Sequence, residues 1–174
     1  MSQHIIELNG KMPQVGRNAF YATGSLLIGD VQAGDDCTFW FYSVVRGDVC
    51  RIRMGNKVNI QDGVIIHGTY KKFDTSIGNN VSIGHRALVH GCEIGDNVLI
   101  GMGAIIMDGC KINSNTIIGA GSVVLQNTIV PENSIFAGNP AKFIKELDGN
   151  NLSDNIIRIA NDYTMYASWY NNLL

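Results

Sequence analysis

Several features are scarce in this sequence of 174 residues, and each absence excludes a class of protein. No uninterrupted apolar stretch approaches the roughly 20 residues that a bilayer-spanning helix needs. The basic residues form no run longer than Lys71-Lys72 and the net charge is −2, which argues against nucleic acid or a membrane as a partner. The first ten residues lack the basic and apolar regions of a signal peptide, so we expect a cytoplasmic location.

Cysteine and proline are also rare. None of the four cysteines lies in a C-x-x-C pair, which argues against a thiolate metal site, and in the cytoplasm we expect them to be thiols. The three prolines contrast with 20 glycines, which are spread through the chain rather than gathered in a linker. Such spacing indicates an internal repeat.

Aliphatic residues recur at every sixth position over most of the chain. The second half carries an unbroken series: Ile94, Ile100, Ile106, Ile112, Ile118 and Val124. Three earlier blocks have the same spacing: Ala33, Phe39, Val45; Met54, Ile60, Ile66; and Ile77, Ile83, Val89. The phase slips at an insertion over 67–76 and at a one-residue contraction between Val89 and Ile94.

This period predicts a triangular coil. On an α-helix, steps of six residues would rotate the aliphatic positions by about 240° each time and scatter them over three faces. In a triangular coil each hexapeptide is one short strand and a corner, the aliphatic residue points inward, and successive coils stack about 4.8 Å apart. We therefore predict an all-β solenoid, with residues 1–150 forming a β-helix with an N-terminal cap.

The closing segment, residues 151–174, has the pattern of an α-helix packed along the solenoid. Ser153 or Asp154 can cap its start. An apolar stripe at helical spacing follows, formed by Ile156, Ile157, Ala160, Tyr163 and Ala167.

Residues one coil apart should lie side by side. Cys92 and Cys110 are 18 residues apart, as are Glu93 and Lys111, so each pair should be cross-strand neighbours. The first interpretation of the two cysteines is small apolar packing, and the alternative is a redox pair.

Several motifs between residues 45 and 104 form a recognisable set. They are Val45-Arg46-Gly47-Asp48, Asn59-Ile60-Gln61-Asp62-Gly63, Ile66-His67, Gly84-His85, Val89-His90-Gly91-Cys92 and Ile100-Gly101-Met102-Gly103-Ala104. Together they resemble the γ-class carbonic anhydrase family, in particular its short bacterial members of the YrdA type. The resemblance runs from about residue 10 to the terminal segment, and it implies a left-handed parallel β-helix.

Three of the four histidines, His67, His85 and His90, fall on successive predicted coils. Three neutral imidazoles with an open fourth position are the usual composition of a catalytic zinc site. His85 and His90 are five residues apart where corners come every six, so one chain would struggle to bring both to one ion. The resemblance implies a homotrimer in which His67 and His90 come from one subunit and His85 from its neighbour, with Zn²⁺, Fe²⁺ or Co²⁺ as the metal.

The resemblance also assigns supporting roles. Arg46 and Asp48 would form ion pairs across the subunit interface, and a surface turn is the alternative for this Arg-Gly-Asp string. Gln61 would orient the hydroxide that attacks CO2, and Asn59 and Asp62 would orient ligands or hold the interface. A purely structural role as polar corner residues is the alternative for Gln61, Asn59 and Asp62.

The implied reaction is the reversible hydration of CO2 to bicarbonate by water activated on the metal. The sequence departs from the family at the proton shuttle, where Val49 replaces a glutamate and the loop after His67 has Asp74 as its only acid. Tyr163 matches a tyrosine that approaches the metal in short family members, and packing of the terminal helix is the alternative role for this residue. We therefore expect an intact site with slow turnover.

Two other functions stay open. Phe136-Ala137-Gly138-Asn139-Pro140-Ala141-Lys142 resembles a segment of hexapeptide acyltransferases, so an acyltransferase or a metal-dependent acyl-CoA thioesterase is one alternative. A non-catalytic assembly subunit is the other.

Overall fold

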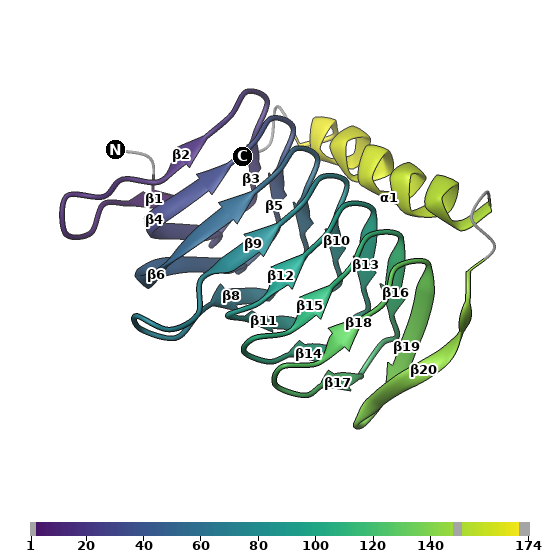
Figure 1. Cartoon of the computed structure of the whole chain (residues 1–174). Helices are drawn as coiled ribbons and strands as arrows, with labels where there is room; N and C mark the ends of the chain where they lie inside the picture. Colours follow the sequence, from purple (N-terminus) through teal and green to yellow (C-terminus); the bar gives the residue numbers. More distant parts are fainter. Residues whose placement is uncertain (1–2, 148–150, 171–174) are drawn as a thin grey trace.

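The chain winds into a parallel β-helix with three faces, and one α-helix lies along its side (Figure 1). This computed structural model describes residues 3–147 and 151–170. The left-handed parallel β-helix with a C-terminal helix that the sequence predicts is confirmed.

The first face is an eight-stranded sheet, which we call the helix-covered face. Its strands are β3 (Phe20–Tyr21), β5 (Thr38–Phe39), β7 (Asn59–Ile60), β10 (Ser82–Ile83), β13 (Val98–Ile100), β16 (Thr116–Ile118), β19 (Ser134–Gly138) and β20 (Ala141–Glu146). All pair in parallel except β20, which returns antiparallel to β19. The helix α1 (Asn151–Ser168) packs against β5 and β10 of this face.

The other two faces form one twelve-stranded sheet, because β4 (Leu26–Ala33) and β6 (Val44–Met54) bend across the corner between them. We call one the histidine face. It carries β1 (Ile5–Ile6), β8 (Ile65–His67), β11 (Leu88–His90), β14 (Ile105–Ile106) and β17 (Val123–Val124).

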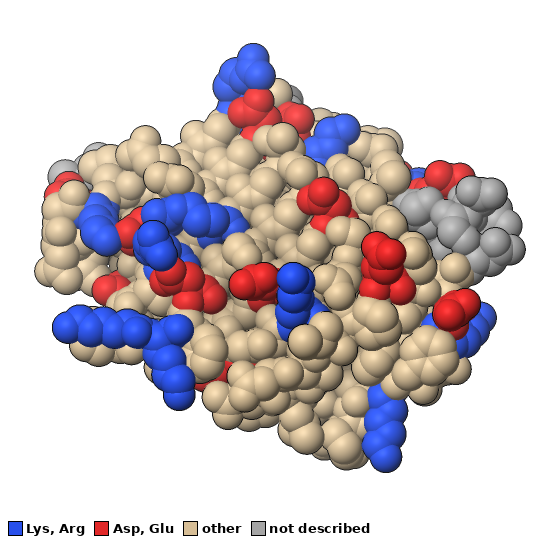
Figure 2. All heavy atoms as spheres, in the orientation of Figure 1, with Lys and Arg blue, Asp and Glu red and all other residues tan. Residues whose placement is uncertain are grey.

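We call the other the polar face. It carries β2 (Gln14–Val15), β9 (Thr75–Ile77), β12 (Glu93–Ile94), β15 (Lys111–Ile112) and β18 (Ile129–Val130). Charged side chains are scattered over this side of the molecule (Figure 2).

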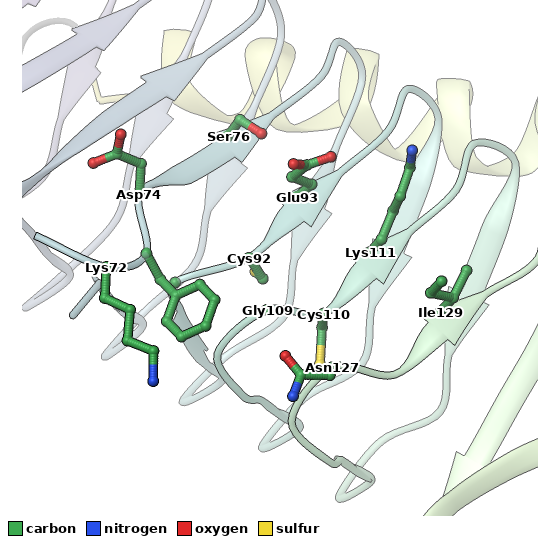
Figure 3. Close-up of a pocket in the computed structure, with 12 residues that line it drawn as sticks. Lys72, Asp74, Ser76, Cys92, Glu93, Gly109, Cys110, Lys111, Asn127 and Ile129 are labelled. Atoms are coloured by element: carbon green, nitrogen blue, oxygen red, sulfur yellow. The ribbon is translucent and has the colours of Figure 1, made fainter.

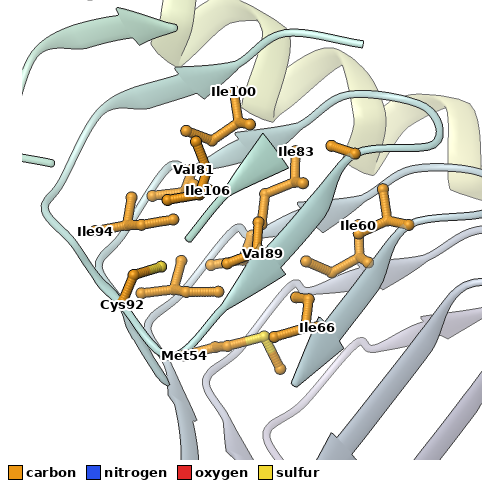
Figure 4. Packing of buried hydrophobic residues seen from close by; sticks show 14 of the residues in the cluster. Met54, Ile60, Ile66, Val81, Ile83, Val89, Cys92, Ile94, Ile100 and Ile106 are labelled. Carbon is orange, nitrogen blue, oxygen red and sulfur yellow. The ribbon is translucent and has the colours of Figure 1, made fainter. Parts of the chain in front are cut away.

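The predicted aliphatic series forms the core (Figure 4). Every member except Ala33 is at most 7 % exposed, and Ala33 is partly buried at the N-terminal end. Fully buried isoleucines line the centre of the prism: Ile60, Ile66, Ile83, Ile100, Ile106 and Ile118. One aliphatic residue per hexapeptide is therefore enough to fill the interior, because three such residues meet in each coil.

Polar side chains stack at one corner of the prism. Asn80, Asn97 and Asn115 occupy successive coils with φ between 54° and 56°, a left-handed conformation that asparagine tolerates better than most residues. The Asn80 amide donates to Asn97 Oδ1 at 3.0 Å, and the Asn97 amide donates to Asn115 Oδ1 at 3.0 Å. This ladder satisfies the corner's polar groups from coil to coil.

The predicted stacking of residues one coil apart is confirmed. Glu93 is in register with Lys111, and Cys92 and Cys110 precede them on adjacent coils (Figure 3). The structure shows no ion pair between Glu93 and Lys111 across the residues it describes. Both cysteines are free and at most 2 % exposed, and burial raises the pKa of each thiol, which favours the packing interpretation.

The helix α1 begins at Asn151, so the prediction that Ser153 or Asp154 caps it is wrong. Both residues lie in its first turn, where the Asp154 carboxylate is favoured by the helix dipole. Ile156, Ala160 and Ala167 are buried as predicted, whereas the helix ends at Ser168 rather than continuing to Leu174; residues 171–174 are outside the described part. No helix in the described ranges is long and apolar enough to cross a membrane.

Removing core volume should destabilise the solenoid far more than removing an outward side chain from the same strand. We expect Ile112→Ala to lower the free energy of unfolding by about 2–5 kcal/mol, because it leaves a cavity between coils. Lys111→Ala, the adjacent outward residue, should change it by less than about 0.5 kcal/mol. Urea unfolding at one protein concentration tests this, and equal losses in the two variants would contradict the inward assignment of Ile112.

Candidate metal centre

His67 and His90 meet at the edge of the histidine face. They are in register on the adjacent parallel strands β8 and β11. His67 Nδ1 lies 3.2 Å from His90 Nε2, so one nitrogen of each ring points at the other. The structure thus brings together the two histidines that the resemblance places in one subunit.

The outer nitrogen of each ring faces a carboxylate. His67 Nε2 is 2.9 Å from Asp48 Oδ1, and His90 Nδ1 is 2.7 Å from Asp108 Oδ1. An ionised carboxylate can only accept hydrogen bonds, so each imidazole donates outward. In neutral rings, the inner nitrogens then carry lone pairs that face one another across 3.2 Å.

Two facing lone pairs need a shared cation, which is either a proton or a metal ion. Two nitrogens bound at about 2.1 Å to one tetrahedral Zn²⁺ are about 3.4 Å apart, close to the spacing here. Carboxylates on the outer nitrogens are the usual support of metal-binding histidines. His67 and His90 therefore fit a metal as two of its ligands.

The surroundings of Asp48 favour the ionised carboxylate that holds His67. Its burial opposes ionisation, but hydrogen bonds from Arg46 and His67 outweigh burial and lower the pKa of the Asp48 carboxyl. Arg46 pairs with Asp48 within the chain. The expectation that these two residues form ion pairs across a subunit interface stays a prediction.

His85 lies apart from this pair, at the corner between the helix-covered and histidine faces. Its Nδ1 is 2.7 Å from Asp62 Oδ2, so this histidine also has a carboxylate on one nitrogen. His90 comes five positions after His85, which allows up to about 17 Å between them. Within residues 3–147 and 151–170 no group of three His, Cys, Asp or Glu side chains could hold a metal.

Gln61 and Asn59 lie near the corner of the prism that carries His85. The Gln61 carbonyl oxygen accepts the backbone N–H of His85 at 3.2 Å, and its amide donates to Asn59 Oδ1 at 3.0 Å. The Asn59 amide donates in turn to Ser82 Oγ at 2.6 Å. Both Gln61 and Asn59 are buried, so within the chain they hold His85 in place.

Tyr163 reaches the same corner from α1. It lines a pocket of 260 Å³ together with His85 and Asp62, and its ring packs edge-on against Trp40. Burial, with a smaller contribution from the negative charge of Asp62, raises the pKa of Tyr163 to about 12. A phenol with that pKa can donate a hydrogen bond but transfers protons poorly near neutral pH.

Asp108 is the residue that sequence reasoning missed. It lies in the coil after His90, 18 residues along the chain, which is one coil of three hexapeptides. This spacing of one coil could have identified Asp108 from the sequence. A pocket of 510 Å³ on the polar face contains none of the predicted site residues (Figure 3).

Comparison with known proteins identifies similar chains. The bacterial transferase hexapeptide (six repeats) family matches residues 74–106 and 91–126. The chain is 41% identical to "Carbonic anhydrase" of Geobacillus kaustophilus, with 97% of this chain and 92% of that protein covered. It is 40% identical to "Protein YrdA" of Escherichia coli, with 91% and 89% covered.

Two further similar proteins differ from these relatives, the first in its length and the second in its name. "Gamma carbonic anhydrase 2, mitochondrial" of Arabidopsis thaliana is 40% identical over 84% of this chain, and the chain spans only 55% of that relative. A hexapeptide transferase family protein from Anaplasma phagocytophilum has a solved structure with a TM-score of 0.91, 34% identity and coverage of 98% of this chain and 99% of that one.

The facing nitrogens predict that the metal-free protein binds a divalent cation. We expect Zn²⁺ to bind at about one ion per chain, and His67→Ala or His90→Ala to abolish this binding because each removes a ligand. Equilibrium dialysis with metal analysis measures it. His4→Ala removes the one histidine outside this set and is the control; equal zinc loss in that variant would contradict the assignment.

Proposed function

The chain belongs to the γ-class carbonic anhydrase family, and we propose that it catalyses the reversible hydration of CO2 to bicarbonate as a cytoplasmic homotrimer. The observation that supports this most strongly is the pair of imidazole nitrogens that face one another at 3.2 Å, each ring held by a carboxylate. In this proposal the two histidines are two of the three ligands of a metal ion.

In this proposal His67 and His90 of one subunit and His85 of the next hold Zn²⁺, or Fe²⁺ or Co²⁺. An ion held by these residues would supply Lewis acidity, which would lower the pKa of water at the open position. Asp48, Asp62 and Asp108 fix the orientation of the three rings. Gln61 places its buried amide beside His85, where it can hydrogen-bond a reacting oxygen in the assembled site.

The surface of the histidine face supports the trimer. Its outward residues form one aligned apolar column: Val44, Ile65, Leu88, Ile105 and Val123. Ile65 is 44% exposed and Ile105 is 37% exposed in the isolated chain. The corresponding column on the polar face includes Ser76, Glu93 and Lys111. A column of aliphatic side chains beside an incomplete metal site suits contact with a second copy.

Proton export is the expected weak step. Val49 cannot carry a proton, and Tyr163 with its raised pKa carries one poorly. Asp74 is the only acid in the loop after His67; burial opposes its ionisation, but hydrogen bonds from Arg51 outweigh burial and lower its pKa. The Asp74 carboxylate is therefore engaged by Arg51 and is a poor proton acceptor. These contacts support slow turnover.

Buffer should relieve that limit. We expect stopped-flow CO2 hydration by the zinc- or iron-loaded protein to rise with imidazole concentration, because the buffer removes the proton that the chain exports slowly. His90→Ala should abolish the activity in every buffer. Full metal occupancy and a trimeric mass with no hydration would contradict the proposal and favour an assembly role.

A metal site formed by histidines of two subunits leads to a second prediction. His67→Ala and His85→Ala should each be inactive, but trimers reassembled from an equal mixture should recover about a quarter of wild-type activity, since one interface in four then has all three histidines. Activity is measured after unfolding and refolding the mixture, with each variant refolded alone as control. No recovery would show that the three ligands come from one chain.

One observation favours a second candidate activity, hydrolysis or transfer of an acyl thioester. A groove of 410 Å³ lies between α1 and the helix-covered face and reaches Gln61 and His85. Aliphatic side chains line it, among them Leu99, Ile117 and Ile159. An acyl chain would occupy such a groove, whereas CO2 does not require it. Release of free thiol from an acyl-CoA, assayed beside CO2 hydration in the same preparation, separates the two activities.

A further inference from the structure

The loop over residues 68–74, which interrupts the hexapeptide period, is tied to the histidine-bearing coils at both ends. It closes on itself through Thr69 and Phe73, whose backbone groups pair. At its start Thr69 Oγ1 donates to Asp108 Oδ2 at 3.0 Å. Just after it, Thr75 Oγ1 donates to the carbonyl of His67 at 2.6 Å and accepts the N–H of Gly91 at 3.1 Å.

Asp108 divides its carboxylate between this loop and His90. Oδ2 accepts from Thr69, and Oδ1 faces His90 Nδ1 at 2.7 Å. The Asp108 side chain is 24% exposed, so it is largely shielded from water. A carboxylate bound at both oxygens cannot rotate, and it therefore fixes both the plane of the His90 ring and the nitrogen that carries the proton.

The surrounding backbone is arranged for this contact. Gly91 has a φ of +55°, and a Cβ at this position would collide with Asp108 Oδ1 and with Phe73 Cβ. The Asp108 side chain thus crosses the space above Gly91 to reach His90. Only glycine leaves this space free while adopting that conformation without strain.

We propose that Asp108 is a positioning residue for His90, held in place by Thr69, so that the 68–74 loop acts as a strap that pre-orients a metal ligand. The relay is Thr69 to Asp108 to His90, and it leaves His90 Nε2 free to bind the ion. This inference rests on the proposed function. The proposed role of the 68–74 loop is to orient a metal ligand rather than to transfer protons, because Asp74 in this loop is a poor proton acceptor.

The test compares zinc affinity with fold stability. We expect Asp108→Ala to weaken Zn²⁺ binding by about 10–100-fold, measured by competition with a chromophoric chelator. Asp108→Asn should lose less, because an amide oxygen still accepts from His90. Thr69→Val should weaken binding in the same direction, and Thr69→Ser, which restores the hydroxyl, should recover it.

A second readout reports geometry directly. The visible absorption spectrum of the Co²⁺-loaded trimer should change in Asp108→Ala and Thr69→Val, because the d–d bands depend on the orientation of the ligands. Asp96→Ala is the matched control. Asp96 also accepts hydrogen bonds from the neighbouring coil, from the Asn79 backbone N–H at 2.6 Å and its amide at 3.0 Å, but it contacts no histidine. It should lower thermal stability without changing zinc affinity or the Co²⁺ spectrum.

The possible outcomes distinguish failure of this inference from failure of the proposed function. If the wild type binds zinc and Asp108→Ala and Thr69→Val match it within about twofold, the strap is wrong and the metal site stands. If the wild type binds no zinc, the proposed function and the strap both fall. If Asp108→Ala does not fold, Asp108→Asn and Thr69→Val decide, because both keep the volume of the original side chain.

Discussion

Hydrogen bonding between the backbones of stacked coils is the constraint on which the rest of this structure depends. It fixes neighbours at the spacing of a parallel sheet, so residues 17 to 23 apart in sequence must lie side by side. The aliphatic core, the asparagine ladder and the contact between His67 and His90 all follow from that register. A chain built this way can assemble a polar site from distant residues, because the scaffold positions one side chain per coil at each point of the prism.

The polar groups around His67 and His90 satisfy one another everywhere except between the two rings. Asp48 and Asp108 accept hydrogen bonds from the outer ring nitrogens, and the two carboxylates accept further hydrogen bonds from Arg46 and Thr69. The remaining electron pairs point at each other, which is unfavourable until a cation lies between them. In the proposed metal site the two rings would therefore need little rearrangement to bind an ion, because Asp48 and Asp108 already hold them in place.

The sequence predicted the coil, the buried series and the stacking of Cys92 on Cys110, because a strict period determines which residues point inward. The proximity of His67 and His90 was harder to derive, since they are 23 residues apart and the 68–74 loop breaks the period between them. Asp108 was missed because an aspartate in a corner reads as a solvated residue until its neighbour one coil back is considered. The start of α1 was misplaced since several capping residues precede its apolar stripe.

In the proposed homotrimer, the unequal surfaces of the three faces explain why one chain supplies only two of the three histidines around each metal ion. One face is covered by α1, one is charged, and the third exposes an aliphatic column between His85 at one edge and His67 with His90 at the other. A strand across one face separates the two edges, so folding the chain more tightly cannot join them without breaking the coil. In the proposed homotrimer, a copy rotated about a three-fold axis would set one edge against the other and bury the aliphatic column at the same time. Apolar burial and metal coordination would then favour the same assembly, and neither would require a change in the fold of the subunit.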